Sequence, residues 1–278
     1  VRRLADPDLR GIAVEALAGF GPKIIGALED VLEDENVDPP IRRNVPRVLR
    51  HIDDQRAVDV LIRALPVKNL SVRTAVLKAL SKMREAYPNL NYETTNLIKQ
   101  VHEEARSYFE NHGALSALRD ANGSRPATAL LVRTLEDRLN ATLDRLFRLI
   151  GLKYPPRQIY AAYLAVNRRD GEEFTAALDF LDNVLERELK RVMIPLLDED
   201  SVLAKRGQEL FSIAPVDAAG AMRSLIHSGD IWLASCAMAA AAELRMREVA
   251  PDIRTVGDSG GKEVAHVARS AEAALAIA

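Results

Sequence analysis

The stretch NLSVRTAVLKAL, Asn69–Leu80, sets the pattern that organises most of the chain. It opens with a residue whose side chain can cap a helix, and an apolar residue then precedes Arg73. Apolar residues follow three, six and seven positions after this arginine, at Val76, Ala79 and Leu80. That spacing places them on one face of a helix, so the stretch predicts an amphipathic helix with one buried side.

The same pattern occurs twice upstream, in DPDLRGIAVEAL (Asp6–Leu17) and DPPIRRNVPRVL (Asp38–Leu49). Arg10 and Arg42 take the place of Arg73, and the three arginines are almost evenly spaced. Weaker copies in the second half keep a similar spacing and are anchored at Thr175, Ala204, Leu233 and Ala265. A fixed period of roughly 30 residues is typical of a solenoid.

Each repeat also contains a second apolar stripe, which predicts a pair of helices per repeat. The clearest stripe has the spacing i, i+3, i+4, i+7, i+8 and consists of Leu189, Val192, Met193, Leu196 and Leu197. Other second helices are expected after the turn GFG (Gly19–Gly21) and after Asp54.

The middle of the chain departs from the period, because no clear anchor occurs between Arg73 and Thr175. Long helices separated by a loop at 121–125 are expected instead, over 92–121, 126–152 and 157–167. The sequence therefore predicts an all-α, right-handed superhelical solenoid with a long-helix insertion. Its expected parts are N-terminal repeats (1–85), inserted helices or degenerate repeats (86–169) and C-terminal repeats (170–278).

The composition limits the classes of function. A net charge of −2 and 5% aromatic residues argue against binding of nucleic acid over the whole surface. A single cysteine cannot form an internal disulfide, which favours a reducing, cytoplasmic location. The longest apolar run, Ile231–Ala242, is too short to span a bilayer. Because the chain begins at Val1 and both ends are apolar, we expect it to be a piece of a longer protein.

Residues able to carry chemistry are present but are not arranged for it. Six carboxylates between Leu181 and Ser201 are expected to be solvated, with Glu186 paired to Lys190 four residues on. The histidines lack metal-site spacing, and Cys236 is expected to be buried in the helical core. Trp232 is expected in the core or in packing between repeats, with an exposed binding role as the alternative. No catalytic, cofactor-binding or metal-binding residue is predicted, and no cofactor. Basic residues from Arg133 to Arg148 interleave with acids, so we expect a salt-bridged helix surface there, with an anionic docking patch as the alternative.

The passages LIRALPVKN (Leu61–Asn69), VRTAVLKAL (Val72–Leu80) and MIPLLDEDSVLAKRGQELF (Met193–Phe211) resemble HEAT repeats of the short bacterial kind. The resemblance extends over both repeat blocks, roughly two thirds of the chain. It implies a ladder of Asp–Arg pairs between repeats. Ala204 and Leu233 stand where the arginine would be, which places that ladder in doubt in the second block.

The passages Arg145–Asp170 and Ala177–Asp198 resemble the soluble helical region of large bacterial membrane proteins. Those proteins combine a part similar to ATP/ADP translocases, HEAT repeats and often a cyclic-nucleotide-binding domain. This resemblance implies a cytoplasmic module of an inner-membrane protein. Its partners would be other domains of the parent chain, and it would meet the membrane only through a missing parent domain.

The leading hypothesis is therefore a non-catalytic scaffold, or a regulatory or spacer module, that binds a protein partner and no nucleic acid. Polar residues on the second helices are the candidate contacts: Arg63, Lys190, Arg191 and Arg223. The main alternative is a HEAT-like DNA glycosylase for alkylated bases, which would need aromatic residues beside basic walls. A HEAT-like lyase or chaperone for a chromophore protein is a third possibility.

Overall fold

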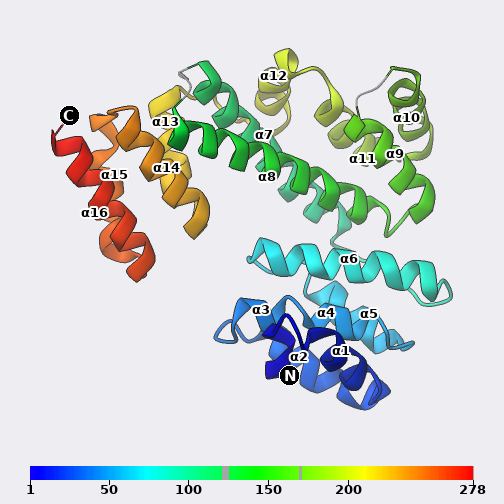
Figure 1. Ribbon diagram of the computed structural model, residues 1–278. Coiled ribbons are helices and arrows are strands. Elements are labelled where there is room, and N and C mark those ends of the chain that lie inside the picture. The colour runs from blue at the N-terminus through cyan, green and yellow to red at the C-terminus, as the bar shows by residue number, and fades with distance from the viewer. Residues whose placement is uncertain (121–124, 169–170, 278) are drawn as a thin grey trace. The chain divides into compact units, whose positions relative to one another are not determined.

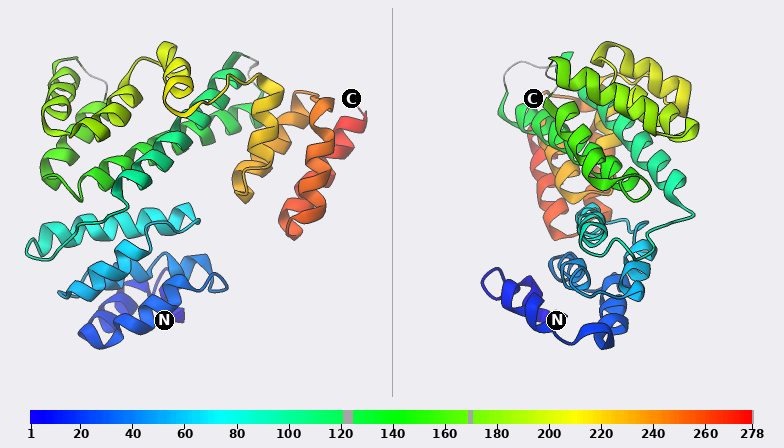
Figure 2. Two further views of the ribbon diagram at one scale, coloured as in Figure 1. Left: turned by 180° about the vertical axis from the view of Figure 1, so that it is seen from behind. Right: turned by 90° about the vertical axis from the view of Figure 1, so that its right-hand side faces the viewer.

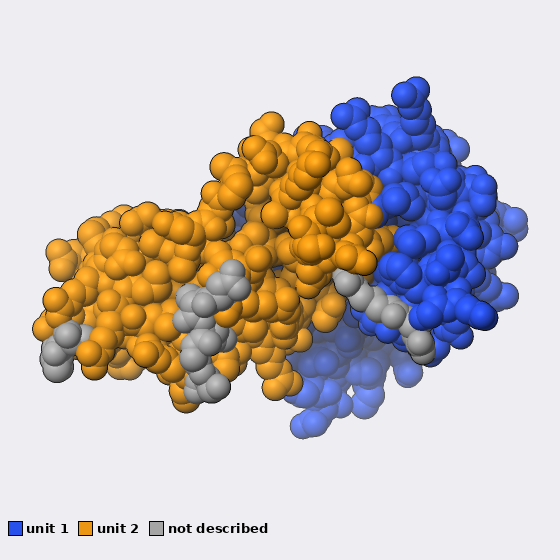
Figure 3. Space-filling view, turned by 90° about the horizontal axis from the view of Figure 1, so that it is seen from above, with its two compact units in different colours: residues 1–104, 144–194 blue, residues 105–143, 195–278 orange. Residues whose placement is uncertain are grey.

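The computed structural model describes residues 1–120, 125–168 and 171–277, and these form helices and connecting turns without any strand (Figure 1). The all-α fold predicted from the sequence is confirmed. The expected loop at 121–125 lies almost wholly outside the described residues. The chain divides into two compact units (Figure 3): unit 1 contains residues 1–104 and 144–194, and unit 2 contains residues 105–143 and 195–278. The three-part division at 85 and 169 stays a prediction.

Unit 1 contains the first repeats and a later group of helices. Its complete helices are α1 (Arg10–Ala18), α2 (Ile25–Glu33), α3 (Pro39–Arg42), α4 (Val45–Leu49), α5 (Gln55–Arg63), α6 (Leu70–Ala86), α9 (Pro156–Arg168), α10 (Gly171–Val184) and α11 (Arg187–Met193). Two long helices, α7 (Leu97–Asp120) and α8 (Pro126–Ile150), contribute residues to both units. Within unit 1, α6 packs on α4 and α5, as the ribbon views show (Figure 2).

The predicted apolar faces of the second and third repeats are buried. Val45, Val48 and Leu49 are inaccessible to solvent, and so are Val76 and Leu80. The helix α6 begins as the sequence indicated, because the Asn69 side chain accepts hydrogen bonds from the amides of Ser71 and Val72. The first repeat fits less well: Ala16 is exposed, and Val14 is the buried residue of α1.

The first helix of the second repeat is broken, although the sequence predicted one continuous helix. It is divided into α3 and α4 by a turn at Arg43 and Asn44. Pro46 explains the break, because proline has no amide hydrogen to donate to the carbonyl of Arg42. The Asn44 side chain is buried and donates to the carbonyl oxygens of Leu4 and Pro40, at 3.0 and 2.7 Å.

Two of the three anchoring arginines, Arg42 and Arg73, donate to backbone carbonyl groups. Arg42 is buried, and its Nε donates to the carbonyl oxygen of Leu32 at 3.0 Å. Arg73 makes the equivalent bond to the carbonyl of Val67 at 2.9 Å. Among the residues described here, neither forms an ion pair with an aspartate that opens a repeat. The Asp–Arg ladder that the resemblance implied is therefore not what holds these repeats together.

A buried charge network joins three helices of unit 1. Glu104 of α7 is 1% exposed and accepts from Arg73 of α6 at 2.8 Å and from Arg145 of α8 at 2.9 Å. The side chains of the two arginines are 14% and 4% exposed. Burying charges in this way is costly unless they are paired, so this network depends on all three members.

The start of α7 differs from the prediction. A helix was expected from Tyr92, but α7 begins at Leu97. The side chains of Asn91 and Thr94 accept hydrogen bonds from the amides of Glu93 and Asn96. Such local bonds compete with helix formation and hold residues 92–96 in a loop. In α11 and the turn that follows it, by contrast, the predicted stripe from Leu189 to Leu197 is fully buried.

Unit 2 contains the C-terminal helix pairs, which pack with residues 105–120 of α7 and 126–143 of α8. Its own helices are α12 (Asp200–Phe211), α13 (Ala218–Ile226), α14 (Ile231–Glu243), α15 (Ala250–Ser259) and α16 (Lys262–Ile277). The helices α14, α15 and α16 pack together with α13 (Figure 1). Asp230 caps α14 with its side chain, as the repeat openings suggested, and Asp217 caps α13 in the same way.

Close packing in unit 2 depends on Gly207 of α12. A Cβ atom there would lie 3.2 Å from the Cβ of Phe109 and 3.4 Å from its ring. Phe109 is 3% exposed, and its ring also contacts Phe211, with ring centroids 5.7 Å apart. The absence of a side chain at Gly207 thus lets α7 approach α12 closely.

The first turn of α8 is capped from a distant part of unit 2. The Glu243 carboxylate accepts from the amides of Ala127 and Thr128 at 3.1 and 2.9 Å, and from the Thr128 hydroxyl at 2.8 Å. Partial burial raises the pKa of Glu243, but the bonds from Thr128 and Ala127 outweigh it and hold the pKa below its usual value. A carboxylate at a helix N-terminus is favourable because it meets unpaired amides and the positive end of the dipole.

Replacing Glu243→Ala is expected to destabilise the protein by about 1 kcal/mol at neutral pH, as for loss of a helix cap. Since the folded pKa lies below the unfolded one, the contribution is complete above about pH 4.3 and disappears as pH falls through the folded pKa. Urea unfolding of both proteins at several pH values measures this. Glu248→Ala, at an exposed site, is the control. A stability difference that persists unchanged in strong acid would contradict the cap.

No single described helix is long and apolar enough to cross a membrane. One pair, Arg10–Ala18 with Gly21–Glu33, passes the length and composition test only when taken together, and it is bent by 110°. Gly21 makes this bend with a φ of 61°, which glycine adopts readily, in agreement with the turn predicted at GFG.

Candidate functional site: a basic groove in unit 1

A groove of about 530 Å³ lies between the first helices of the second and third repeats. One wall consists of three arginines spaced by four and three residues: Arg43 in the turn between α3 and α4, Arg47 within α4 and Arg50 directly after it. The other wall is α6, which contributes Ser71, Thr74, Ala75, Lys78 and Ala79. The lining thus contains four cations and no carboxylate or aromatic side chain.

The charge of this basic groove is not neutralised by the protein. Arg43, Arg47, Arg50 and Lys78 form no ion pair with any residue that the structure describes. Burial lowers the pKa of Arg47, and Arg10, Arg50 and Arg43 lower it further because like charges repel. The pKa of His51 is lowered by burial and then by Arg50, whose Nε donates to His51 Nε2 at 3.3 Å. An anion entering the groove would relieve this repulsion.

The wall formed by α6 offers few hydrogen-bond donors. The Ser71 hydroxyl donates to Asn69 Oδ1 at 2.7 Å, and the Thr74 hydroxyl donates to the carbonyl of Leu70 at 2.8 Å. The amides of Ser71 and Val72 are bonded to Asn69 as well. Binding in the groove therefore depends on the cationic side chains.

Of the contact residues predicted from the sequence, three are exposed and Lys190 is half-buried, and most of them are paired. Arg63, at the end of α5, is bonded to Glu29 of α2. On α11, Lys190 pairs with Asp182 at 3.1 Å, while the neighbouring Arg191 is exposed. These three belong to unit 1, and none of them lines the groove.

The fourth predicted contact, Arg223 of α13, belongs to unit 2. Its Nε lies 3.5 Å from Asp252, which also bonds His227 Nε2 at 2.9 Å. The Arg223 side chain is 47% exposed, so it remains accessible to a partner despite this pair. Whether any of the four predicted residues contacts a partner stays a prediction.

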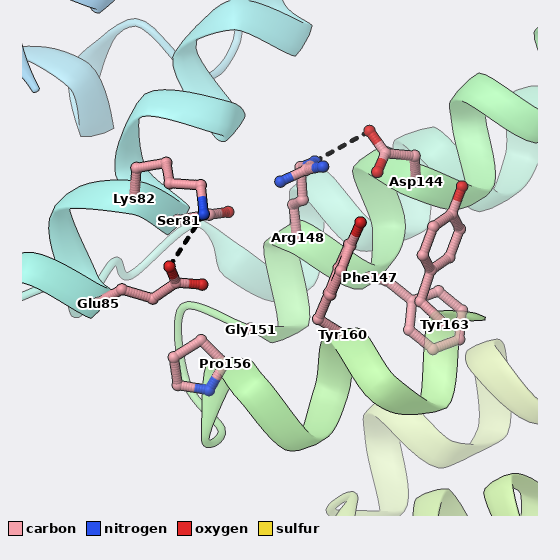
Figure 4. A pocket seen from close by; sticks show the side chains of 10 residues that line it. All are labelled: Ser81, Lys82, Glu85, Asp144, Phe147, Arg148, Gly151, Pro156, Tyr160 and Tyr163. Carbon is pink, nitrogen blue, oxygen red and sulfur yellow. Dashed lines mark hydrogen bonds and ion pairs between the residues drawn. The ribbon is translucent and has the colours of Figure 1, made fainter. Parts of the chain in front are cut away.

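A second hollow in unit 1 is small and aromatic (Figure 4). It has a volume of about 130 Å³, and its lining includes Phe147, Tyr160 and Tyr163. Arg148 bonds Asp144 at 2.9 Å, and its guanidinium carbon lies 5.9 Å from the centroid of the Tyr160 ring. That distance is within the range of a cation–π contact. The charges of this hollow thus neutralise one another, unlike those of the groove.

Four of the six carboxylates between residues 181 and 201 form ion pairs: Asp182, Glu186, Asp198 and Asp200. Glu186 pairs with Lys153, so the predicted pair between Glu186 and Lys190 is wrong. Asp198 pairs with Arg206 in unit 2. Among the described residues, no group of His, Cys, Asp and Glu side chains has the geometry to hold a metal ion.

Of two further predictions, the one for Cys236 is confirmed and the one for Trp232 is not. Cys236 is buried at 4% exposure, as predicted, and burial raises the pKa of its thiol. Trp232 was expected in the core or in packing between repeats but is 58% exposed, next to the exposed Ile231. It occupies the first turn of α14, whose buried face begins only at Leu233.

Most basic residues of α8 form ion pairs, as expected for a salt-bridged helix. Arg145 pairs with Glu104 and Arg148 with Asp144 in unit 1, and Arg138 pairs with Asp230 in unit 2. The alternative considered for this cluster, an anionic docking patch, placed the candidate patch on α8, and the sequence analysis did not find the groove. A signal was available, because the fifth residue after the anchoring arginine is Arg47 in the second repeat and Lys78 in the third.

Residues 1–81 match the family of HEAT repeats. This segment contains nearly all of α1 to α6 and every residue that lines the basic groove. The match supports HEAT-like repeats in this segment of the chain, in agreement with the all-helical architecture. No curated protein and no solved structure matched the chain.

Proposed function

We propose that this HEAT-like protein is a non-catalytic scaffold that holds a protein partner. HEAT repeats commonly serve as protein-interaction scaffolds. The observation that carries the proposal for this chain is the basic groove, an open surface with four unneutralised cations in the segment that matches HEAT repeats. Such a surface favours association with an acidic partner.

The proposal has a narrower form, in which the module is a cytoplasmic spacer or regulatory part of a larger membrane protein. Its support is the resemblance of residues 145–170 and 177–198 to the soluble region of translocase-like proteins. In that form the partner is another domain of the same chain. An immunoblot of fractionated host cells distinguishes the two forms. A membrane-fraction band far larger than the 30.6 kDa of this chain would support the narrower form, and a soluble band of that mass would contradict it.

Site-specific photocrosslinking in the native host tests the scaffold itself. A photoreactive residue in place of Arg63, Arg191 or Arg223 is expected to yield discrete crosslinked species of higher mass, because exposed scaffold residues contact the partner. The same residue at the buried Leu77 is the control and is expected to yield none. Scanning then extends to Ser71 in the groove. Absence of crosslinked species from all exposed positions would contradict the proposal.

A further inference from the structure

We infer that the basic groove binds an extended acidic segment of a protein partner whose carboxylates occur at alternate residues. This inference rests on the proposed scaffold function and specifies the chemistry of the partner. Its support comes from the charge, the spacing and the hydrogen-bond donors of the groove.

The charge of the groove requires an anionic occupant. Four cations line it, no carboxylate does, and the nearby Arg10 adds to the repulsion that lowers the pKa of Arg47. The chain as a whole carries a net charge of −2, so this positive patch is local. A local patch on a mildly acidic protein attracts an acidic segment without attracting anions over its entire surface.

The spacing of the cations fits an extended peptide. Arg43, Arg47 and Arg50 follow one another by four and then three positions, which along a helix would be about 6 and then about 4.5 Å, and the turn at Arg43 and Asn44 interrupts the first step. Side chains on one face of an extended strand are about 6.7 Å apart, because each residue rises about 3.3 Å. Three carboxylates at alternate positions can therefore meet the three guanidinium groups, with Lys78 on the opposite wall.

The donors of the groove favour separate carboxylates over a compact phosphate. Phosphate sites commonly use helix N-terminal amides and hydroxyl groups in addition to cations. Here the N-terminal amides of α6 and the hydroxyls of Ser71 and Thr74 already donate within the protein. What remains is a row of long cationic side chains, and guanidinium groups pair well with carboxylates in bidentate geometry.

The size of the groove favours a peptide over a nucleic acid. Stable binding to duplex DNA commonly uses about 6–10 phosphate contacts, more than four clustered cations supply. Single-stranded nucleic acid binds largely by stacking on aromatic side chains, and the groove lining contains none.

Fluorescence anisotropy with the full chain tests the inference. The probe is a short fluorescein-labelled peptide with three glutamates at alternate positions in a serine background, and its glutamine counterpart is the control. We expect saturable binding of the glutamate peptide that weakens as salt is added, and a loss of affinity of about tenfold or more in Arg47→Glu and Lys78→Glu. Lys99→Glu changes the net charge equally at an exposed site on α7, outside the groove, and is expected to bind normally.

Arg47 and Lys78 are exposed, so their replacement should leave the fold intact, and thermal unfolding of each variant verifies this. As an independent check, Arg47→Gln removes the charge without reversing it and should give an intermediate loss. Equal binding by Lys99→Glu and Arg47→Glu would overturn the inference, as would stronger binding of a phosphoserine peptide or of duplex DNA. If every peptide failed to bind while crosslinks still formed at Arg63 or Arg223, peptide binding in the groove would be refuted, but the proposed scaffold function would not.

Discussion

Replacing Glu104→Ala is expected to destabilise the protein by about 3–5 kcal/mol, one of the two largest effects that we predict for a single substitution. The carboxylate is the shared partner of Arg73 and Arg145, and its side chain is 1% exposed. Its removal leaves two guanidinium groups with little access to water and without their counterion. Denaturant unfolding followed by circular dichroism measures the change.

The matched control is Glu103→Ala, one residue earlier on the same helix. The Glu103 side chain is 46% exposed and lies 3.9 Å from Lys99, so its loss should cost no more than about 0.5 kcal/mol. Glu104→Gln keeps the shape but removes the charge, and a loss of about 1.5–3 kcal/mol is expected because charge-assisted hydrogen bonds are weakened. Equal stability of the Glu103 and Glu104 variants would show that the network contributes nothing.

A triple variant distinguishes the net contribution of the intact network to stability from the stability lost when one member is removed. Replacing Arg73→Met, Glu104→Leu and Arg145→Met removes every charge at once. Since apolar residues of similar volume often replace a buried ion network without loss, most of the stability lost in Glu104→Ala should return. Part of the loss will remain, because Arg73 also donates to the carbonyl of Val67.

The period of the sequence was sufficient to predict the repeat helices, because the apolar stripe of each helix is a local pattern. The stripe from Leu189 to Leu197 and the faces of the second and third repeats are buried as expected. The repeat spacing predicts less well which residues are buried where the residues at the inward positions are small. Ala16 and Ala239 occupy predicted inward positions but are exposed, since alanine tolerates either environment at little cost.

Contacts between repeats were much harder to predict than the helices themselves. Glu104 pairs with Arg73 and Arg145, which are 31 and 41 residues away in the sequence. It lies one repeat interval after Arg73, but a glutamate stands there in place of the anchoring arginine, so the pattern did not mark it. The groove was not predicted for the same reason. Its two walls are surfaces of two different repeats, and the sequence shows each wall separately. Trp232 was misplaced for a related reason: the apolar run in which it occurs is longer than the face that α14 buries.

Replacing Phe109→Ala is expected to cost about 3–5 kcal/mol, as for other large aromatic side chains deleted from a packed core. Phe109 is 3% exposed, its ring contacts Phe211, and its Cβ and ring would lie within 3.4 Å of a Cβ atom at Gly207. Phe20→Ala is the control, because the Phe20 side chain is 64% exposed and should contribute no more than about 0.5 kcal/mol. Urea unfolding compares the two variants with the parent protein, and equal losses would contradict the packing described for Phe109.

The pairing of Phe109 with Gly207 can be isolated by a double-mutant cycle. Gly207→Ala alone gains about 1 kcal/mol of helix propensity but crowds Phe109, so it should be neutral or destabilising by about 1–2 kcal/mol. Once Phe109 is replaced by alanine, the ring no longer obstructs the added methyl group, which then fills part of the cavity. Gly207→Ala should therefore become stabilising in that background, giving a coupling energy of at least about 1 kcal/mol. Strict additivity of the two substitutions would mean that α7 and α12 do not meet at these residues.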